Sequence, residues 1–203
     1  MRGPCGNITG TAIDAGLELW GKRIGLLKEA LPKLSNVCLI IQAPRKNWEE
    51  GRYGSAIREA AKAASTHLNA VTLEGKIDEA VYQRVFAAFE QDGPDALILS
   101  DHIVHLVNAV TIVGLAAKHR LPTMYAWREF VEIGGLMSYA TDLVELGRSA
   151  GSQIGQILNG TNPGDIPFNQ ATHYELAINL KTAKSLGIEF PATLLGSADF
   201  VFE

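Results

Sequence analysis

The side chains best suited to chemistry gather in one short segment, Tyr125-Ala126-Trp127-Arg128-Glu129-Phe130. In an extended segment, alternation places Tyr125 and Trp127 on one face, where they would offer an aromatic platform. Arg128 can hold a carboxylate through two parallel hydrogen bonds, because its guanidinium is a planar fork of donors. A surface ion pair between Arg128 and Glu129 explains the same residues without a ligand. The segment therefore leaves two interpretations open, a carboxylate-binding site and a solvated ion pair.

Three other segments carry polar side chains close to apolar runs. Gln42 precedes two cations and an indole in residues 45–48, which could bind an anionic or aromatic group or form a solvated loop. Asp101 directly follows an apolar run and could contact a ligand or cap the next helix, since Asp is favoured at N-cap positions. The hydroxyl of Ser138 could bind a ligand or satisfy the backbone of a turn. These residues are candidates only if the fold brings them to one edge.

Patterns typical of enzymes and metal sites fail on their context. His102 and His105 lie three residues apart and could share a helical face, but no third ligand is predicted nearby, so we expect no metal site. Gly147-Arg148-Ser149-Ala150-Gly151 spells G-x-S-x-G within a helical pattern instead of a strand-to-helix turn. A hydrolase would need Ser149 to leave that helix. The N-terminal glycines lack the spacing of a phosphate-binding loop. We therefore expect neither enzymatic activity nor a cofactor.

The composition narrows the class of partner. The 203 residues carry 22 acidic and 18 basic side chains, a net charge of −4, which does not favour nucleic acid or an anionic membrane. Apolar runs such as Val37–Ile41 fall far short of the roughly 20 residues that span a bilayer. Cys38 lies in this run and indicates a buried thiol; nothing supports a bridge to Cys5. No secretory leader opens the sequence, which read alone indicates the cytoplasm.

Helical and strand patterns alternate along most of the chain and would position these candidates. We predict helices at residues 17–31, 51–67, 78–90, 104–119, 142–158 and 180–186, the last ended by Gly187. We predict strands at 35–42, 69–73, 96–100, 123–127 and 175–179. This order is typical of an α/β fold with a doubly wound parallel sheet. Ligands of such sheets lie beyond the carboxyl ends of the strands, so segments 42–48, 101–105, 126–130 and 138–141 would share one edge.

Several longer segments together resemble one protein family. They are GNITG at 6–10, GKRIGLLKEALP at 21–32, LAAKHRLP at 115–122, REFVEIGGLMSY at 128–139 and INLKTAKSLG at 178–187. In this order they closely resemble ABC-transporter substrate-binding proteins of the tryptophan/tyrosine-type uptake family. The match covers nearly the whole chain, which makes it more specific than any single motif.

The resemblance implies a type I periplasmic-binding-protein fold, in which two doubly wound lobes joined by three crossovers close on a small solute. Such a protein catalyses no reaction and delivers an amino acid or related carboxylate to a permease. The ligand-facing residues would come from Gln42, Asp101, Tyr125, Trp127, Arg128 and Ser138. The alternative is a ligand-sensing effector domain of the same fold without a transport role. The acidic charge and the absence of a helix-turn-helix before Gly6 disfavour DNA binding.

The resemblance also implies a missing part. In the family, the segment at Gly6–Gly10 follows a first lobe of about a hundred residues, and Cys5 stands where glycine is usual. We therefore expect Met1 to be an internal or misassigned start, or the product of a truncation. Residues 1–11 would be a crossover remnant, 12–135 the second lobe, and 136–203 a return crossover, helix and tail packing partly with the first lobe. The exposed apolar surface would favour self-association. The location would be periplasmic by resemblance, or cytoplasmic if the start is as given.

Overall fold

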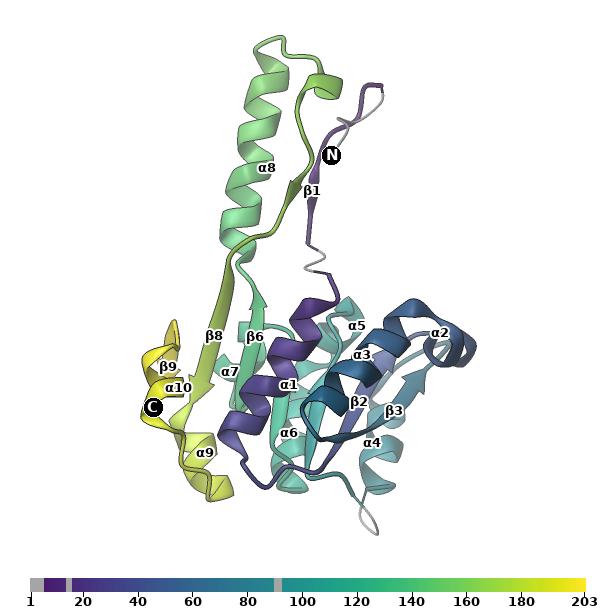
Figure 1. Ribbon diagram of the computed structural model, residues 1–203, viewed down its shortest axis with the longest axis vertical. Helices are drawn as coiled ribbons and strands as arrows, with labels where there is room; N and C mark the ends of the chain where they lie inside the picture. Colours follow the sequence, from purple (N-terminus) through teal and green to yellow (C-terminus); the bar gives the residue numbers. More distant parts are fainter. Residues whose placement is uncertain (1–5, 14–15, 90–92) are drawn as a thin grey trace. The chain divides into compact units, whose positions relative to one another are not determined.

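The computed structural model describes residues 6–13, 16–89 and 93–203 (Figure 1). Cys5 and Glu90, the end of one predicted helix, lie outside them. The chain divides into two compact units. Unit 1 comprises the described part of Met1–Gly16 together with Thr141–Tyr174, and unit 2 comprises Leu17–Ala140 and Glu175–Glu203. Each unit is considered by itself.

Unit 2 is built on a mostly parallel sheet. Its strands are β2 (Asn36–Gln42), β3 (His67–Leu73), β4 (Ala96–Leu99), β5 (Thr123–Tyr125), β6 (Met137–Thr141), β8 (Tyr174–Asn179) and β9 (Phe200–Phe202). They are ordered β3-β2-β4-β5-β6-β8-β9. Neighbours from β3 to β6 are parallel, as are β8 and β9, while β8 runs opposite to β6 (Figure 1). The α/β class with a doubly wound, mostly parallel sheet is confirmed.

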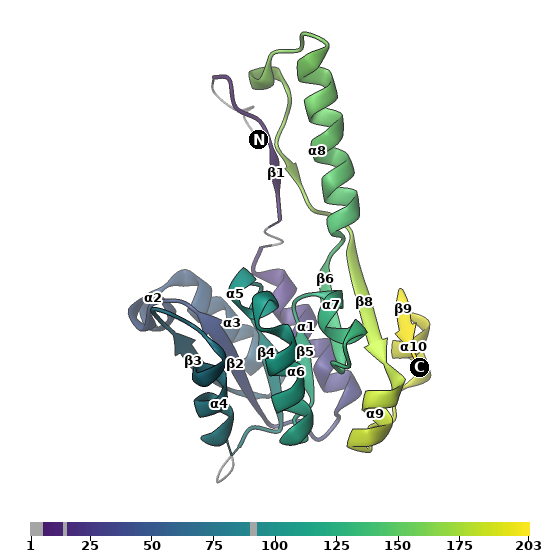
Figure 2. The same cartoon turned by 180° about the vertical axis from the view of Figure 1, so that it is seen from behind.

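Helices cover both faces of this sheet, as the front and rear views show (Figures 1 and 2). One apolar cluster joins the sheet to α1 (Glu18–Ala30), α3 (Arg52–Ala63), α9 (Leu180–Leu186) and α10 (Ala192–Gly196). The other joins it to α4 (Glu79–Ala87), α6 (Ala109–Lys118) and α7 (Arg128–Glu132). The remaining helices are α2 (Arg45–Glu50) and α5 (Ile103–Val107). Burial of both faces explains why β2 is almost continuously apolar, as central parallel strands are.

Most predicted elements are confirmed, and the errors have local causes. The helix predicted at 104–119 breaks at Asn108, whose side-chain amide donates to the carbonyl of Val104 at 2.8 Å. The strand predicted at 123–127 is confirmed as β5, which ends at Tyr125, and the helix α7 that begins at Arg128 was not predicted. The segment after Gln42, expected as a loop, forms α2 from Arg45. Gly187 follows α9 with φ 76°, a left-handed conformation that glycine adopts without strain, as predicted.

Unit 1 contains the longest helix and a small sheet. α8 (Leu143–Leu158) follows Asp142, whose carboxylate accepts from the N–H groups of Val144 and Glu145 at 2.8 and 3.0 Å. The short strands β1 (Thr11–Ala12) and β7 (Asn169–Gln170) pair in parallel, and a 3-10 turn spans Pro163–Asp165. The buried amide of Gln153 donates to the carbonyls of Gly10 and Pro167, at 3.2 and 3.1 Å, and so ties α8 to both flanking segments.

Candidate functional site

The strand order of unit 2 defines where a ligand would bind. The chain passes from β2 outward to β3, and then returns to the other side of β2 to form β4, β5 and β6. Between β2 and β4 the direction of winding reverses, and ligands of open α/β sheets bind beyond the carboxyl ends of the strands at such a switch point. Gln42 ends β2, and Ser100 and Asp101 follow β4. Gln42 is half-buried and Asp101 is exposed.

An arginine that sequence reasoning did not single out lies in this region. Arg23, on α1, has only 1% of its surface exposed, and its Nε donates to the carbonyl of Tyr139 at 2.9 Å. Its guanidinium carbon lies 5.1 Å from the centre of the Trp20 ring. Trp20 is held in turn by a hydrogen bond from its Nε1 to the hydroxyl of Tyr53, at 2.9 Å. The guanidinium is thus fixed by elements on one face of the sheet.

The electrostatics of Arg23 are those of a buried cation with incomplete pairing. Burial lowers the pKa of Arg23 below its ordinary value, while the charge of Asp101 opposes this shift. An arginine stays protonated in a protein, so the charge remains. Among the described residues, its Nη1 has no hydrogen-bond partner. A buried charge is costly unless it is hydrogen-bonded, and a ligand carboxylate is the group that would complete this fork.

Arg128, the arginine predicted to bind a carboxylate, is already paired within the protein. Its Nε donates to Glu132 and its Nη1 to Glu175, both at 3.1 Å. Its guanidinium carbon also lies 4.3 Å from the centre of the Phe200 ring. The partners are not the adjacent Glu129, because α7 places residues four apart on the same face. These contacts tie α7 to β8 and β9.

The aromatic residues predicted beside it are enclosed in the core. Tyr125 and Trp127 belong to the same buried cluster. The Tyr125 ring stacks on Phe130, with ring centres 4.8 Å apart, and burial raises the pKa of its hydroxyl far above the usual value. Gly135 packs so closely that an added Cβ would lie 2.6 Å from this ring, so only glycine fits there. Trp127 directly precedes α7 as its N-cap residue.

Two further buried polar atoms lack partners among the described residues, Nε1 of Trp127 and Oγ of Ser138. Ser138 pairs with Tyr125 across β5 and β6 and therefore shares its face of the sheet. Arg23 packs from α1 on the opposite face. Buried donors and acceptors are nearly always satisfied in proteins, so these atoms and Nη1 of Arg23 mark positions that a ligand's polar groups could complete.

The other sequence candidates differ in their surroundings. Asp101 does not cap α5; the side chain of His102 does so, by accepting from the N–H of Val104 at 3.3 Å. Arg45 forms an exposed pair with Glu49 at 2.6 Å. Ser149 lies within α8, as predicted, and accepts from the Asn169 amide at 2.5 Å. Cys38 is a buried free thiol whose pKa burial raises to about 12, which makes it unreactive.

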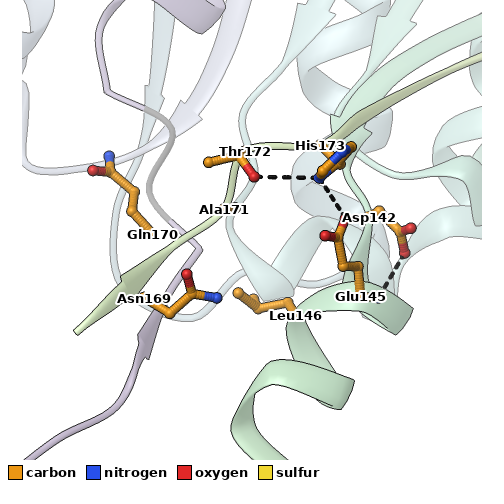
Figure 3. Close-up of a pocket in the computed structure, with 8 residues that line it drawn as sticks. All are labelled: Asp142, Glu145, Leu146, Asn169, Gln170, Ala171, Thr172 and His173. Atoms are coloured by element: carbon orange, nitrogen blue, oxygen red, sulfur yellow. Dashed lines mark hydrogen bonds and ion pairs between the residues drawn. The ribbon is translucent and has the colours of Figure 1, made fainter. Parts of the chain in front are cut away.

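Two hollows lie away from this edge. In unit 1, a hollow at the start of α8 is lined by Asp142, Glu145 and residues 169–173 (Figure 3). There, Nδ1 of His173 lies 2.7 Å from a Glu145 oxygen and 3.2 Å from the Thr172 hydroxyl. Its volume of about 20 Å³ suits a single water and is too small for an amino acid.

A shallow groove of about 420 Å³ lies near Leu34 and Ile188, at the start of β2. That is the opposite end of the strand from Gln42.

The spacing on α1 is the signal that could have found Arg23. Lys22 and Arg23 are adjacent cations and suggest a solvated face. However, Arg23 follows Leu19 by four residues and Trp20 by three, which places it on the apolar stripe of α1. All seven buried residues of the helix, Arg23 among them, lie along that stripe.

Three known proteins are similar to this chain over most of its length. A tyrosine-binding protein of Clostridioides difficile is 28% identical over 201 residues, covering 92% of this chain and 51% of that protein. A solved structure described as an ABC domain in complex with L-Trp, from Streptococcus pneumoniae, has a TM-score of 0.80 and 22% identity, covering 99% of this chain and 67% of that one. A conserved domain protein of Vibrio cholerae also has a TM-score of 0.80, with 21% identity, covering 96% and 63%.

The solved structures named above share the fold of this chain. The pattern that characterises the ABC transporter substrate binding proteins matches residues 1–202, so the chain belongs to that family. It spans about half the length of the tyrosine-binding relative. The family is one of substrate-binding proteins, and the relative from Clostridioides difficile is described as tyrosine-binding. In the described residues, no helix is long and apolar enough to cross a membrane.

Proposed function

We propose that the chain is the solute-binding component of an ABC-type importer, which captures an amino acid or a related carboxylate and delivers it to a permease. The family assignment supports a solute-binding role. The relatives described as binding tyrosine and L-Trp support an amino acid as the solute. Work with a permease implies a location outside the cytoplasm, which is part of the proposal.

The observation that carries the proposal is the buried guanidinium of Arg23. Its Nε is occupied by the carbonyl of Tyr139, and its Nη1 has no partner in the part of the chain that the structure describes. A carboxylate supplies the negative charge and the acceptor that this group lacks. Asp101, whose charge acts on Arg23, is exposed and is the proposed partner of the ammonium group of the same ligand.

The other ligand contacts are proposed from position and unused polar atoms. Trp127 and Ser138 each have a buried polar atom without a described partner, and Gln42 ends a strand at the switch point. Tyr125 and Arg128 were also predicted from the sequence to face the ligand, but neighbouring residues engage both side chains in the structure, so we propose no ligand contact for them. We also propose that residues 12–135 form the second of two lobes, that 1–11 and 136–203 belong to the crossovers and tail, and that a first lobe completes the cleft.

The test compares two arginines of unit 2. In Arg23→Gln, we expect the affinity for L-tryptophan, measured by titration calorimetry, to fall about 10- to 100-fold, because a charge-assisted hydrogen bond is lost. Arg128→Gln is the matched control and should change the affinity by less than about threefold. Equal losses in the two variants, or a loss confined to Arg128→Gln, would contradict the role of Arg23. Circular dichroism of each variant checks that it is folded.

We further propose that the chain self-associates through the apolar residues that α8 exposes. Val144, Ile154 and Leu158 are all more than half exposed, and contiguous exposed apolar surface is typical of an interaction site. Sedimentation velocity should show a mass that grows with concentration, and Ile154→Ser/Leu158→Ser should reduce it. A monodisperse monomer at all concentrations would count against this proposal.

A further inference from the structure

Three buried polar side chains from separate elements form one hydrogen-bonded chain in unit 2. The Tyr82 hydroxyl, on α4, lies 2.7 Å from Nδ1 of His105, on α5. Nε2 of the same imidazole lies 3.0 Å from Oγ of Ser100, the residue that follows β4. Tyr82 and His105 have no exposed surface and Ser100 has 3%. These hydrogen bonds therefore link α4 to both ends of the turn formed by residues 100–105.

The His105 imidazole at the centre of these hydrogen bonds is neutral at physiological pH. Burial lowers the pKa of His105 to about 4, and the charge of His102 acts in the same direction. A neutral imidazole has one N–H donor and one acceptor. Either Tyr82 donates to Nδ1 and Nε2–H donates to Ser100, or Ser100 donates to Nε2 and Nδ1–H donates to Tyr82. In both arrangements the two ring nitrogens of His105 are satisfied.

The turn that these hydrogen bonds hold in place contains Asp101. The Ser100 N–H donates to the carbonyl of Ile40 on β2 at 3.0 Å, and the N–H of residue 105 donates to the carbonyl of His102 at 3.0 Å. Asp101 lies between these anchors, and it is exposed. The imidazole joins Ser100 on one side of Asp101 to α5 on the other, so it limits how far the turn can move.

We propose that His105 is a positioning residue for the ligand site, because it fixes the Ser100–His102 turn and thereby the carboxylate of Asp101 relative to Arg23. This inference rests on the proposed function, in which Arg23 and Asp101 bind the ligand. An apolar residue at 105 would leave the Ser100 and Tyr82 hydroxyls buried without this partner. Burying a hydroxyl without a hydrogen-bond partner costs free energy. The turn would therefore shift to expose these hydroxyls to water.

The first test needs no ligand. In His105→Leu, we expect the amides of Ser100 and Val104 to exchange hydrogen about tenfold faster, while the amide of Leu97 within β4 keeps its rate. His105→Gln should restore slow exchange, since its side-chain amide can donate through its NH₂ group and accept through its carbonyl oxygen. Phe86→Leu, a buried change on α4 outside the chain of hydrogen bonds, is the control for general destabilisation. Unchanged exchange in His105→Leu would overturn the positioning role.

The second test measures the consequence for binding, with L-tryptophan as the probe in titration calorimetry. His105→Leu should weaken binding about tenfold, and His105→Gln should recover most of the affinity. In an Asp101→Asn background, His105→Leu should cause no further loss, because residues that act through one another are not additive. Full additivity would overturn the inference. If the unaltered chain binds no amino acid while exchange at the turn still responds to His105, the proposed function fails and the positioning of the turn stands.

Discussion

The two units differ in how they use apolar residues. Unit 2 buries a cluster on each face of its sheet, so its helices and strands stabilise one another. Unit 1 buries few side chains among its described residues, and α8 exposes apolar residues along much of its length. A chain segment that leaves this much apolar surface in water is typical of an interface. The comparison indicates that unit 2 has a core on each face of its sheet, whereas the described part of unit 1 buries few apolar side chains.

The largest expected effect is on the free energy of unfolding, and it differs between the two units. Leu27 on α1 has no exposed surface, and Leu27→Ala should lower the free energy of unfolding by about 3 kcal/mol through lost burial and a cavity. Leu158 on α8 is 82% exposed, and Leu158→Ala should change it by less than about 0.5 kcal/mol. Urea denaturation followed by circular dichroism measures both. A large cost at Leu158 would show that α8 is packed in the isolated chain.

A second prediction concerns the buried histidine of unit 2. The pKa of His105 is near 4 in the folded chain, against an ordinary value of 6.5. Between these values the unfolded state binds more protons, so stability is full above about pH 6.5 and falls as the pH is lowered towards 4. The expected loss is about 3 kcal/mol, from the size of the shift.

Denaturation at a series of pH values measures this loss. His105→Gln should remove most of the pH dependence. Phe86→Leu, a buried change that removes no titratable group, should leave the dependence unchanged. A pH dependence that persists in His105→Gln would contradict the assignment.

The smallest expected effect concerns the start of α8. Asp142 accepts from two backbone N–H groups there, so Asp142→Ala should destabilise the helix by about 1 kcal/mol, while Asp142→Asn should cost much less. Hydrogen exchange at the amides of Val144 and Glu145 reports this locally. Equal protection in the alanine and asparagine variants would show that the cap contributes little to unit 1.

The sequence was sufficient for the elements whose pattern is strong. The apolar run of β2 and the stripe of α1 predict a buried strand and an amphipathic helix, and both are present. β6 was missed, since Ser138 and Tyr139 interrupt its apolar character and two glycines precede it. α7 was missed because its five residues are too few to show a helical period. The local sequence pattern predicts an element correctly only when packing against neighbouring elements does not favour a different structure.

The candidate site was harder to predict, because it depends on which polar groups remain unpaired after folding. Arg128 was chosen for its residue type, yet Glu132 and Glu175 already occupy its guanidinium. Arg23 was passed over beside Lys22, yet it is the arginine that is buried and incompletely paired. Glu175 lies far from Arg128 in sequence, so no local pattern could show that pair. The edge at the carboxyl ends of the strands was chosen from topology alone, and it stays a prediction.

The central claim is that this edge recognises a carboxylate through Arg23. Its most direct test is a calorimetric titration of the unaltered chain with L-tryptophan and, separately, with L-tryptophanamide, which keeps the indole and the amino group but lacks the carboxylate. We predict saturable binding of L-tryptophan and an affinity for the amide at least about tenfold lower, the effect of losing one charge-assisted hydrogen bond. Equal affinity for the two compounds, or binding of the amide alone, would contradict the account.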